Sequence, residues 1–393
     1  MKDEVVILSA VRTPLGGFQG DLSSLSAPLL GAKSIEAALK SAGVSESAID
    51  EVYLGNVVSA GVGQAPARQA SLNAGLSKSV PCTTVSKVCG SGMKAVMLAA
   101  NAIKVGSLNC AIAGGMESMS NAPYLLEKAR AGHRLGHHSV RDSLFVDGLE
   151  DVNSGQLMGF FGQQTADRFD FSRVQMDDFA IESLNRAKTA SDSGYFKQEI
   201  CPIVVKTRNG TNTISEDEQI RTAKPERIPH LKPAFKTDGT ITAANSSSIS
   251  DGAAALVLAS AEYCASQSLS PMAKILAYAS HAQAPEEFTL APIGAMQKVL
   301  EQVAWSVDDV HLFEINEAFA AVTMIAMQEL DIDHERVNVN GGACAIGHPL
   351  GASGARIIVT LIHALKRLGK TRGVASLCIG GGEATAIAIE CTN

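Results

Sequence analysis

The sequence of 393 residues is poor in aromatic and in charged side chains. Aromatic residues make up 5% of it, with a single tryptophan, and charged residues make up 19%, whereas hydrophobic residues reach 46%. This composition is typical of a large, tightly packed globular protein and excludes an intrinsically disordered chain. The net charge is −7 and no dense basic run is present, so we expect no nucleic-acid partner.

Other signals are missing as well. The eight cysteines are scattered without a Cys-x-x-Cys pair, which predicts reduced thiols rather than a disulfide framework or a metal site. No apolar run reaches membrane-spanning length, so we expect no membrane insertion. The N-terminus leads straight into a strand and residues 390–393 form no targeting tag, so we expect no signal peptide and a cytoplasmic protein.

Strand-like and helical segments alternate along the first part of the chain. We predict buried strands at residues 4–9, 52–57 and 109–117, and helices at 27–42 and 65–74. Such alternation is typical of βαβ units, so we expect a largely parallel sheet covered on both faces.

The last third of the chain repeats this alternation. After a buried strand at 253–259, which follows the middle segment, the predicted elements are strands at 272–280 and 373–379, a strand and turn at 338–342, and helices at 294–303 and 355–368. Residues 110–115 and 378–382 resemble each other, which supports a duplication into two similar α/β lobes. An active site is then expected where the strand ends of the two lobes meet.

Residues 121–244 have a different character, with long polar stretches and one convincing helix at 176–191. We interpret this segment as an insertion from the first lobe. Its basic residues include Lys206, Arg208, Arg221, Lys224, Arg227 and Lys232. They form either a solvated face or a patch that accepts the phosphates of a long cofactor.

One cysteine on a glycine turn is the first candidate for chemistry. A β-branched run at residues 83–88 breaks at Cys89 and passes into an Ala/Met/Leu-rich helical run at 93–100. Backbone N–H groups and the dipole at a helix N-terminus favour a thiolate. We interpret Cys89 as a nucleophile on a strand-turn-helix elbow, with a buried structural cysteine as the alternative.

Three further side chains with catalytic chemistry stand at tight turns. Asn316 lies at a strand-to-helix junction, His348 lies in a glycine-rich run at 341–354, and Cys378 precedes a glycine triplet at 380–382. His348 would be the base that a cysteine nucleophile needs, and Cys378 would move a proton to or from carbon. The Asn316 amide and backbone N–H groups would bind an oxyanion.

Each of these residues also has a structural interpretation. His348 could cap a turn, Asn316 could be a helix N-cap, and Cys378 could fill the core. The run at 341–354 could instead cradle a phosphate, as in a dinucleotide-binding oxidoreductase, but its glycines lack the Gly-x-Gly-x-x-Gly spacing. The combination of all these side chains favours catalysis.

Five separated segments resemble the motifs of the thiolase family, in its order and at its spacing. They are residues 88–92, 316–319, 338–342, 347–354 and 378–382, and the similarity covers residues 4–390. The resemblance implies an α/β thiolase fold, in which duplicated βαβ-type half-domains form a five-layered αβαβα core with an inserted loop domain. It also implies a homodimer or homotetramer.

The same resemblance sets the expected domain boundaries. The N-terminal half-domain would comprise residues 1–120 and be completed by 245–270. The loop domain, which receives coenzyme A, would comprise 121–244, and the C-terminal half-domain 271–393.

The resemblance implies a role for each catalytic candidate. Cys89 would be acylated, and His348 would take the thiol proton and help to hold the thioester oxygen. Cys378 would move the proton on the acetyl carbon. Asn316 would belong to one oxyanion hole, through a water, and the backbone N–H groups of Cys89 and Gly380 would form another.

Coenzyme A contacts are implied for Arg221 and Ser247, and Ala318 and Phe319 would lie near the pantetheine arm.

The chain departs from many short-chain members of the family at two places. Residues 156–165 differ from the usual run, with Leu157 in place of a histidine, and residues 382–384 lack a Met-Gly. These positions would surround the acyl pocket, so the preferred acyl chain length stays open.

The implied function is reversible, ping-pong acyl transfer between coenzyme A thioesters, with no permanently bound cofactor. The enzyme would condense two acetyl-CoA to acetoacetyl-CoA or thiolyse a 3-ketoacyl-CoA. One alternative is a ketoacyl-synthase-type condensing enzyme, which would usually have histidine or asparagine in the role of Cys378. Another is a catalytically silent, thiolase-like acyl-CoA-binding protein, which would be expected to lack the nucleophile or the base.

Overall fold

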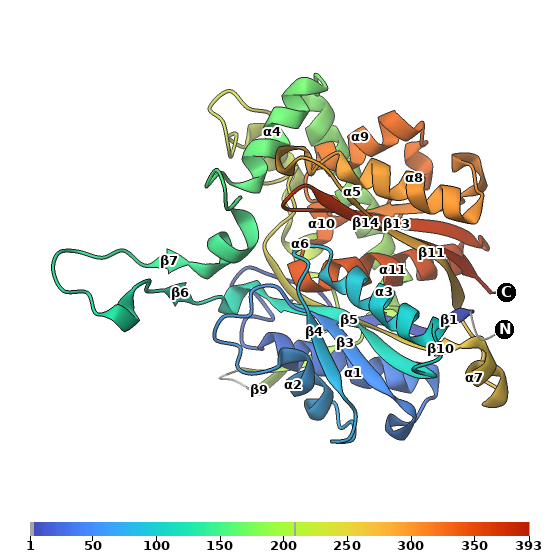
Figure 1. The fold of residues 1–393 in the computed structure, drawn as a ribbon. Helices are drawn as coiled ribbons and strands as arrows, with labels where there is room; N and C mark the ends of the chain where they lie inside the picture. The colour runs from blue at the N-terminus through green and yellow to red at the C-terminus, as the bar shows by residue number, and fades with distance from the viewer. Residues whose placement is uncertain (1–3, 208–209, 393) are drawn as a thin grey trace.

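A computed structural model describes residues 4–207 and 210–392, and a single large sheet runs through the molecule (Figure 1). The strand order is β12-β13-β14-β11-β1-β10-β5-β3-β4, with β2 beside β10. The sheet strands are β1 (Val5–Arg12), β2 (Gly16–Gly17), β3 (Glu51–Gly55), β4 (Cys82–Val85), β5 (Cys110–Ser118), β10 (Ser250–Ser260), β11 (Ala273–Ala282), β12 (Leu312–Ile315), β13 (Arg372–Ile379) and β14 (Glu383–Cys391).

The sheet consists of two half-sheets joined at β1 and β11. This junction has only three residue pairs, from Val5–Ile275 to Ile7–Ala273. From the junction outward, the order β1-β10-β5-β3 in one half matches β11-β14-β13-β12 in the other. The topology therefore confirms the predicted duplication.

The prediction of a largely parallel sheet is wrong. Only β3/β4, β3/β5 and β12/β13 run parallel, and the remaining neighbours along the sheet are antiparallel. The reason is that the last strand of each half, β10 or β14, returns between the first strand and a βαβ strand. In the second half a tight glycine turn joins β13 directly to β14, and such a turn produces an antiparallel pair.

Helices cover the half-sheets in three layers. The helices are α1 (Ala27–Ala42), α2 (Pro66–Asn73), α3 (Ser91–Lys104), α4 (Met158–Arg168), α5 (Arg173–Asp192), α6 (Glu218–Thr222), α7 (Ala261–Ser266), α8 (Ala291–Val303), α9 (Ala320–Leu330), α10 (Ala343–Ile346) and α11 (Leu350–Arg367). Helices α3 and α11 pack on each other between the two half-sheets, α1 and α2 cover the outer face of one, and α8 covers that of the other. The result is the expected αβαβα arrangement (Figure 1).

Strand β10 has a continuous apolar sequence because side chains on both of its faces are buried. Ala254, Leu256 and Leu258 point into the cluster around α3 and α11, while Ala255 and Val257 point into the cluster beneath α1. Both faces of the strand are buried, so neither face selects polar residues.

The segment between β5 and β10 carries more structure than expected. Besides α5, which was predicted, it contains α4, α6 and a small hairpin of β8 (Ile203–Thr207) and β9 (Gly210–Ile214). It also forms an arm around β6 (Tyr124–Leu125) and β7 (Arg141–Asp142), which projects from the body (Figure 1).

The predicted strand at 338–342 is absent, because Asn338 adopts a left-handed φ of +48°. Its side chain makes the hydrogen bonds to Ile315 that the backbone of a neighbouring strand would otherwise make. Oδ1 accepts the Ile315 N–H and Nδ2 donates to the Ile315 carbonyl, each at 2.8 Å.

In the described part of the chain, no helix is long and apolar enough to cross a membrane.

Candidate active site

Cys89 lies on a strained turn between β4 and α3, as the sequence predicted. The Gly90 N–H donates to the Lys87 carbonyl at 3.0 Å, and the Ser91 hydroxyl donates to the Val88 carbonyl at 2.6 Å. Val88 has a φ of +44°, which is a rare conformation for a β-branched residue. Strain of this kind persists only where surrounding contacts hold it, and it clusters at functional sites.

Glycines let the first turns of α3 and α11 meet. A Cβ on Gly92 would lie 2.9 Å from a backbone nitrogen of α11, and one on Gly354 would lie 2.4 Å from a backbone nitrogen of α3. Only residues without a Cβ allow backbones to approach so closely. Because Cys89 precedes α3 and His348 precedes α11, this contact places both turns at the same end of the central layer.

His348 is buried, and hydrogen bonds hold its backbone N–H and one of its two ring nitrogens. Its backbone N–H donates to the Ser248 carbonyl at 3.1 Å, and Nδ1 lies 2.5 Å from Ser353 Oγ. Nε2 is buried and has no hydrogen-bond partner among the described residues. Burial and the charge of Arg356 lower the pKa of His348 to about 3, so the imidazole is neutral at pH 7.

The turn after β13 brings two more predicted residues to Cys89. The backbone N–H of Gly380 lies near the Cys89 sulfur and lowers the pKa of its thiol. Cys378 is buried, and burial together with the neighbouring Cys89 raises the pKa of its thiol. A Cβ on Gly380 would lie 3.1 Å from the Met158 sulfur, so α4 closes over this turn.

The backbone N–H groups at the Cys89 turn were expected to favour a thiolate, and burial opposes them. Burial raises the pKa of the thiol to about 11, although the N–H groups of Gly380 and of Cys89 itself lower it. Desolvation of the charged form therefore outweighs the favourable contacts at the turn.

Asn316 follows β12 and is oriented by a buried ion pair. Arg356 Nη1 lies 2.8 Å from Glu314 Oε1, and Arg356 Nη2 donates to Asn316 Oδ1 at 3.4 Å. Because a guanidinium can only donate, the amide oxygen faces Arg356. The amide nitrogen is buried, and no described residue accepts a hydrogen bond from it, so it can donate to a ligand oxygen.

Sequence reasoning missed three polar residues that support these turns. Ser353 and Arg356 lie on α11 and contact His348 and Asn316 respectively. Glu117 ends β5 and accepts the backbone N–H groups of Val57, Val58 and Gly351 at 3.0, 3.2 and 2.8 Å. A signal for the first two was present, because they are polar residues in the first turns of a helix rich in apolar residues, directly after the His348 turn.

A cavity of about 540 Å³ adjoins the catalytic turns. Three of the residues predicted to contact coenzyme A line it, namely Ser247, Ala318 and Phe319, together with Leu157 and Met158. The Ser247 N–H donates to the Ala318 carbonyl at 3.0 Å. This hydrogen bond holds the backbone segments of Ser247 and Ala318 together in the wall of the cavity.

A second cavity, of about 420 Å³, shares Gln219, Ala243 and Ser248 with the first. Lys224 and Arg227 from the predicted basic patch also line it. The two cavities therefore share part of one wall, and two cationic side chains line the second. None of Cys89, His348, Asn316, Cys378 and Gly380 lines either cavity.

Arg221 lies elsewhere. Its guanidinium is 2.6 Å from Asp21 Oδ2 and 56% exposed, and it lines neither of these cavities but a smaller one beside β9. Lys206 and Lys232 line neither of the two cavities that share Gln219, and Arg208 lies outside the described residues.

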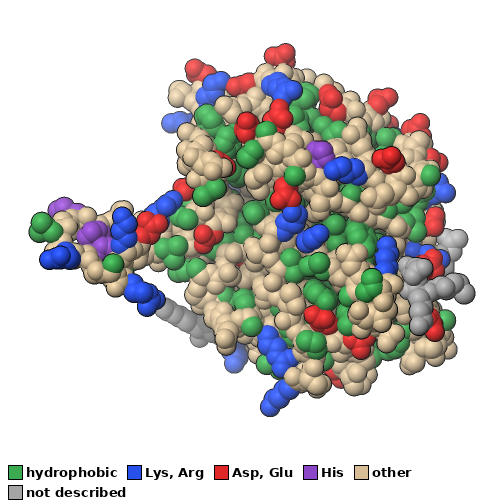
Figure 2. Space-filling view, in the orientation of Figure 1, with side chains coloured by type: hydrophobic (Ala, Val, Ile, Leu, Met, Phe, Trp, Pro, Cys, Tyr) green, Lys and Arg blue, Asp and Glu red, His purple; other side chains and the backbone are tan. Residues whose placement is uncertain are grey.

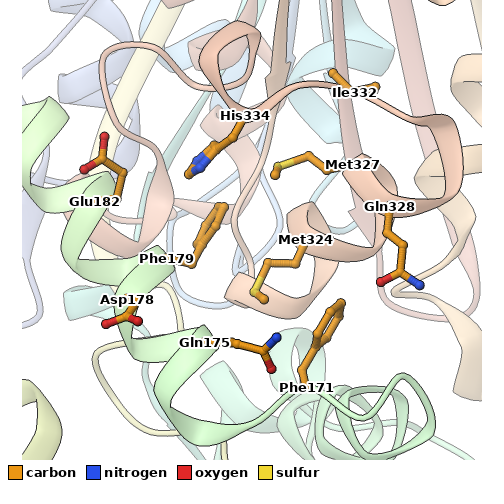
Figure 3. A pocket seen from close by; sticks show the side chains of 10 residues that line it. All are labelled: Phe171, Gln175, Asp178, Phe179, Glu182, Met324, Met327, Gln328, Ile332 and His334. Carbon is orange, nitrogen blue, oxygen red and sulfur yellow. The ribbon is translucent and has the colours of Figure 1, made fainter.

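Another cavity, of about 520 Å³, lies between α5 and α9 (Figure 3). Its apolar wall consists of Phe171, Phe179, Met324 and Met327, and none of the predicted site residues lines it.

Within the described part of the chain, no group of three His, Cys, Asp or Glu side chains is arranged to hold a metal ion.

The family models "Thiolase, N-terminal domain" and "Thiolase, C-terminal domain" match residues 5–262 and 269–391. An acetyl-CoA acetyltransferase of Cupriavidus necator is 46% identical over 98% of this chain and 99% of its own. Acetyl-CoA acetyltransferase 2 of Arabidopsis thaliana is 48% identical over 98% and 97%.

Solved structures agree with these matches. A thiolase of Ascaris suum, crystallised with coenzyme A, has a TM-score of 0.94 and 46% identity, covering 99% of this chain and 100% of its own. The acetyl-CoA acetyltransferase of Bacillus anthracis has a TM-score of 0.97 and 41% identity, with 99% of both chains covered. The chain belongs to the thiolase family.

Proposed function

We propose that this chain transfers acyl groups reversibly between coenzyme A thioesters through an acyl group on Cys89. The observation that carries the proposal is the meeting of a partly buried thiol, a buried thiol and a backbone N–H. The Gly380 N–H lowers the pKa of the Cys89 thiol, and Cys378 lies close enough to Cys89 for the two thiols to interact. The lone Nε2 of His348 adds a buried base.

In thiolysis, the Cys89 sulfur attacks the 3-keto carbon as its proton passes to His348 Nε2. Collapse of the adduct breaks the bond between C2 and C3 and leaves the acyl group on Cys89. The enolate of acetyl-CoA takes a proton from Cys378. A free coenzyme A thiol then gives its proton to Cys378 and attacks the acyl group, and His348 returns its proton to the Cys89 sulfur.

Two sets of donors would stabilise the negative oxygens. The N–H groups of Cys89 and Gly380 suit the oxygen of the tetrahedral adduct, and the Asn316 amide with His348 suits the enolate oxygen. Fixed donors in a buried site lower the barrier because they need no reorganisation during the reaction.

The inserted segment would receive coenzyme A. The cavity beside Ser247, Ala318 and Phe319 suits the pantetheine arm, and Lys224 and Arg227 at the adjoining cavity suit phosphates. Arg221 faces neither cavity, so the position of the other two cations favours them as phosphate partners.

We further propose a homotetramer. Strand β4 is an open edge of the sheet, which suits pairing with a second copy. The projecting arm carries the exposed apolar side chains Tyr124, Leu126, Leu135 and Val140. Figure 2 shows hydrophobic side chains on the arm among basic and histidine side chains, away from the body. Exposed apolar groups on such an arm suit contact between two dimers.

The test is thiolysis of acetoacetyl-CoA and of longer 3-ketoacyl-CoA substrates by the native protein, Cys89→Ala and Cys264→Ala. Cys264 is a buried cysteine on α7, so Cys264→Ala controls for the loss of a thiol. We expect Cys89→Ala to lose at least about 10³-fold in kcat, and Cys264→Ala to keep its activity. Full activity of Cys89→Ala would refute the mechanism, and no turnover by the native protein would favour an acyl-CoA binder. The preferred substrate reports whether Leu157 has changed the acyl pocket.

A further inference from the structure

Among the described residues, the Ser353 hydroxyl makes the only hydrogen bond to a ring nitrogen of His348. Ser353 lies in the first turns of α11 and is completely buried. Its oxygen lies 2.5 Å from His348 Nδ1 and 2.9 Å from the Pro349 carbonyl oxygen. The second contact is the backward bond that serine often makes inside a helix.

We infer that Ser353 is a positioning residue, which holds the neutral His348 ring in the tautomer that can act as the base. A carbonyl oxygen can only accept, and a serine hydroxyl has one proton to give. If Ser353 donates that proton to Pro349, its oxygen must accept from His348, so the imidazole proton sits on Nδ1. Nε2 then carries the lone pair. This inference rests on the proposed role of His348 in proton transfer from Cys89.

The opposite assignment is costly at this site. If Ser353 donated to Nδ1, the ring proton would sit on Nε2, which is buried and has no acceptor among the described residues. A buried N–H without an acceptor is rarer and more costly than an unused lone pair. It would also leave no lone pair to receive the proton of Cys89.

Because its partner is a hydroxyl and not a carboxylate, the His348 ring can release the proton that it takes from Cys89. After His348 takes the proton, Nδ1–H still donates to the Ser353 oxygen, so the imidazolium keeps its partner. Because that partner carries no charge, it does not hold the proton on the ring as the aspartate of a hydrolase triad does. The proton can therefore return to the Cys89 sulfur when the acyl group leaves, as a reversible reaction requires.

The experiment is a double-mutant cycle between Ser353 and His348. The variants are Ser353→Ala, Ser353→Thr, His348→Ala and the double variant Ser353→Ala/His348→Ala. The main readout is the rate at which acetoacetyl-CoA acylates Cys89, followed by mass spectrometry in single turnovers, and steady-state kcat and KM accompany it. Such a cycle isolates the part of the Ser353 effect that acts through His348.

We expect Ser353→Ala to slow acylation by about 10- to 100-fold with little change in KM, because the ring is no longer fixed in one tautomer. Ser353→Thr keeps a hydroxyl and should recover most of the rate. In the His348→Ala background, the same Ser353→Ala change should alter the rate less than about threefold.

Two results would overturn the inference. One is an unchanged acylation rate in Ser353→Ala. The other is an equal loss with and without His348, which would make Ser353 a packing residue only. Failure of the proposed function looks different, because His348→Ala would then acylate as fast as the native protein.

Discussion

His348 is buried and Cys89 is partly buried, and this burial keeps both of them neutral at pH 7. It raises the pKa of the thiol to about 11 and lowers that of the imidazole to about 3. A free enzyme with these values contains a neutral thiol and a neutral imidazole, not the thiolate–imidazolium pair found where a cysteine pKa is strongly depressed. The proton then moves only when a substrate carbonyl is present to take up the negative charge.

This state predicts the pH dependence of alkylation. The thiolate fraction of a thiol grows tenfold per pH unit below its pKa, so the rate at which iodoacetamide alkylates Cys89 should rise about tenfold per unit from about pH 6 to about pH 9. The rate is measured on the free enzyme by mass spectrometry of the peptide that contains Cys89. A plateau near neutral pH would show a stable ion pair and contradict the neutral resting state.

The catalytic side chains were easier to predict than the residues that orient them. Cys89, His348 and Cys378 stand at glycine turns and Asn316 at a strand-to-helix junction, where an unusual residue type is visible in the sequence. Ser353 has a common residue type inside a helix, and its contact with His348 depends on the side-chain rotamer. A sequence pattern does not report a rotamer.

At the scale of elements, periodicity predicted the bounds of several helices, missed α4 of the inserted segment, and predicted strand direction poorly. Helix α1 has the predicted bounds, and α5 and α8 lie within a few residues of theirs. The helix predicted at 355–368 begins earlier, at Leu350, because its first turn is made of small residues packed against α3. The direction of β10 and β14 depends on which strands they pair with across the chain, which no local pattern records.

The arm around β6 and β7 gives the prediction that belongs to this scale. Replacing its exposed Leu126, Leu135 and Val140 together by serine should convert a tetramer into a dimer, because the apolar contact between dimers is lost. The active site lies in the body, so kcat per protomer should stay within about twofold.

Light scattering after size-exclusion chromatography measures the mass of each species. The control is Val105→Ser, which replaces an exposed valine that follows α3 and lies away from the arm. A variant that stays tetrameric at the same protein concentration would exclude the arm as the contact.

At the scale of the whole molecule, one buried cluster of charges ties the inserted segment to the core. Arg12, at the end of β1, lies 2.6 Å from Glu199 and 2.7 Å from Asp217, and all three side chains are completely buried. Thr360 of α11 donates to the same Glu199 oxygen at 3.2 Å. Asp217 also accepts the Leu15 N–H at 2.8 Å and directly precedes α6, so the cluster fixes the helix that carries Gln219 into both cavities.

Removing the cation from this cluster should therefore destabilise the fold and weaken coenzyme A binding. Arg12→Ala leaves two carboxylates buried without their partner, which costs about 3–5 kcal/mol. The triple variant Arg12→Met/Glu199→Gln/Asp217→Asn removes all the charges and should cost less than Arg12→Ala alone, because no buried charge is left unpaired. Lys33→Ala, which removes an exposed ion pair with Glu36, should cost less than about 1 kcal/mol.

Urea denaturation, followed by circular dichroism and by the fluorescence of Trp305, gives the free energy of unfolding of each variant. Kinetics on the folded fraction should show a rise in KM for coenzyme A that exceeds the fall in kcat, because α6 loses its anchor while the turns of Cys89 and His348 stay in place. If Arg12→Ala unfolds within about 1 kcal/mol of the native protein, the cluster contributes no more than an exposed pair. If kcat falls and KM is unchanged, the cluster acts on the catalytic turns through Thr360 and α11, and not on the coenzyme A cavity.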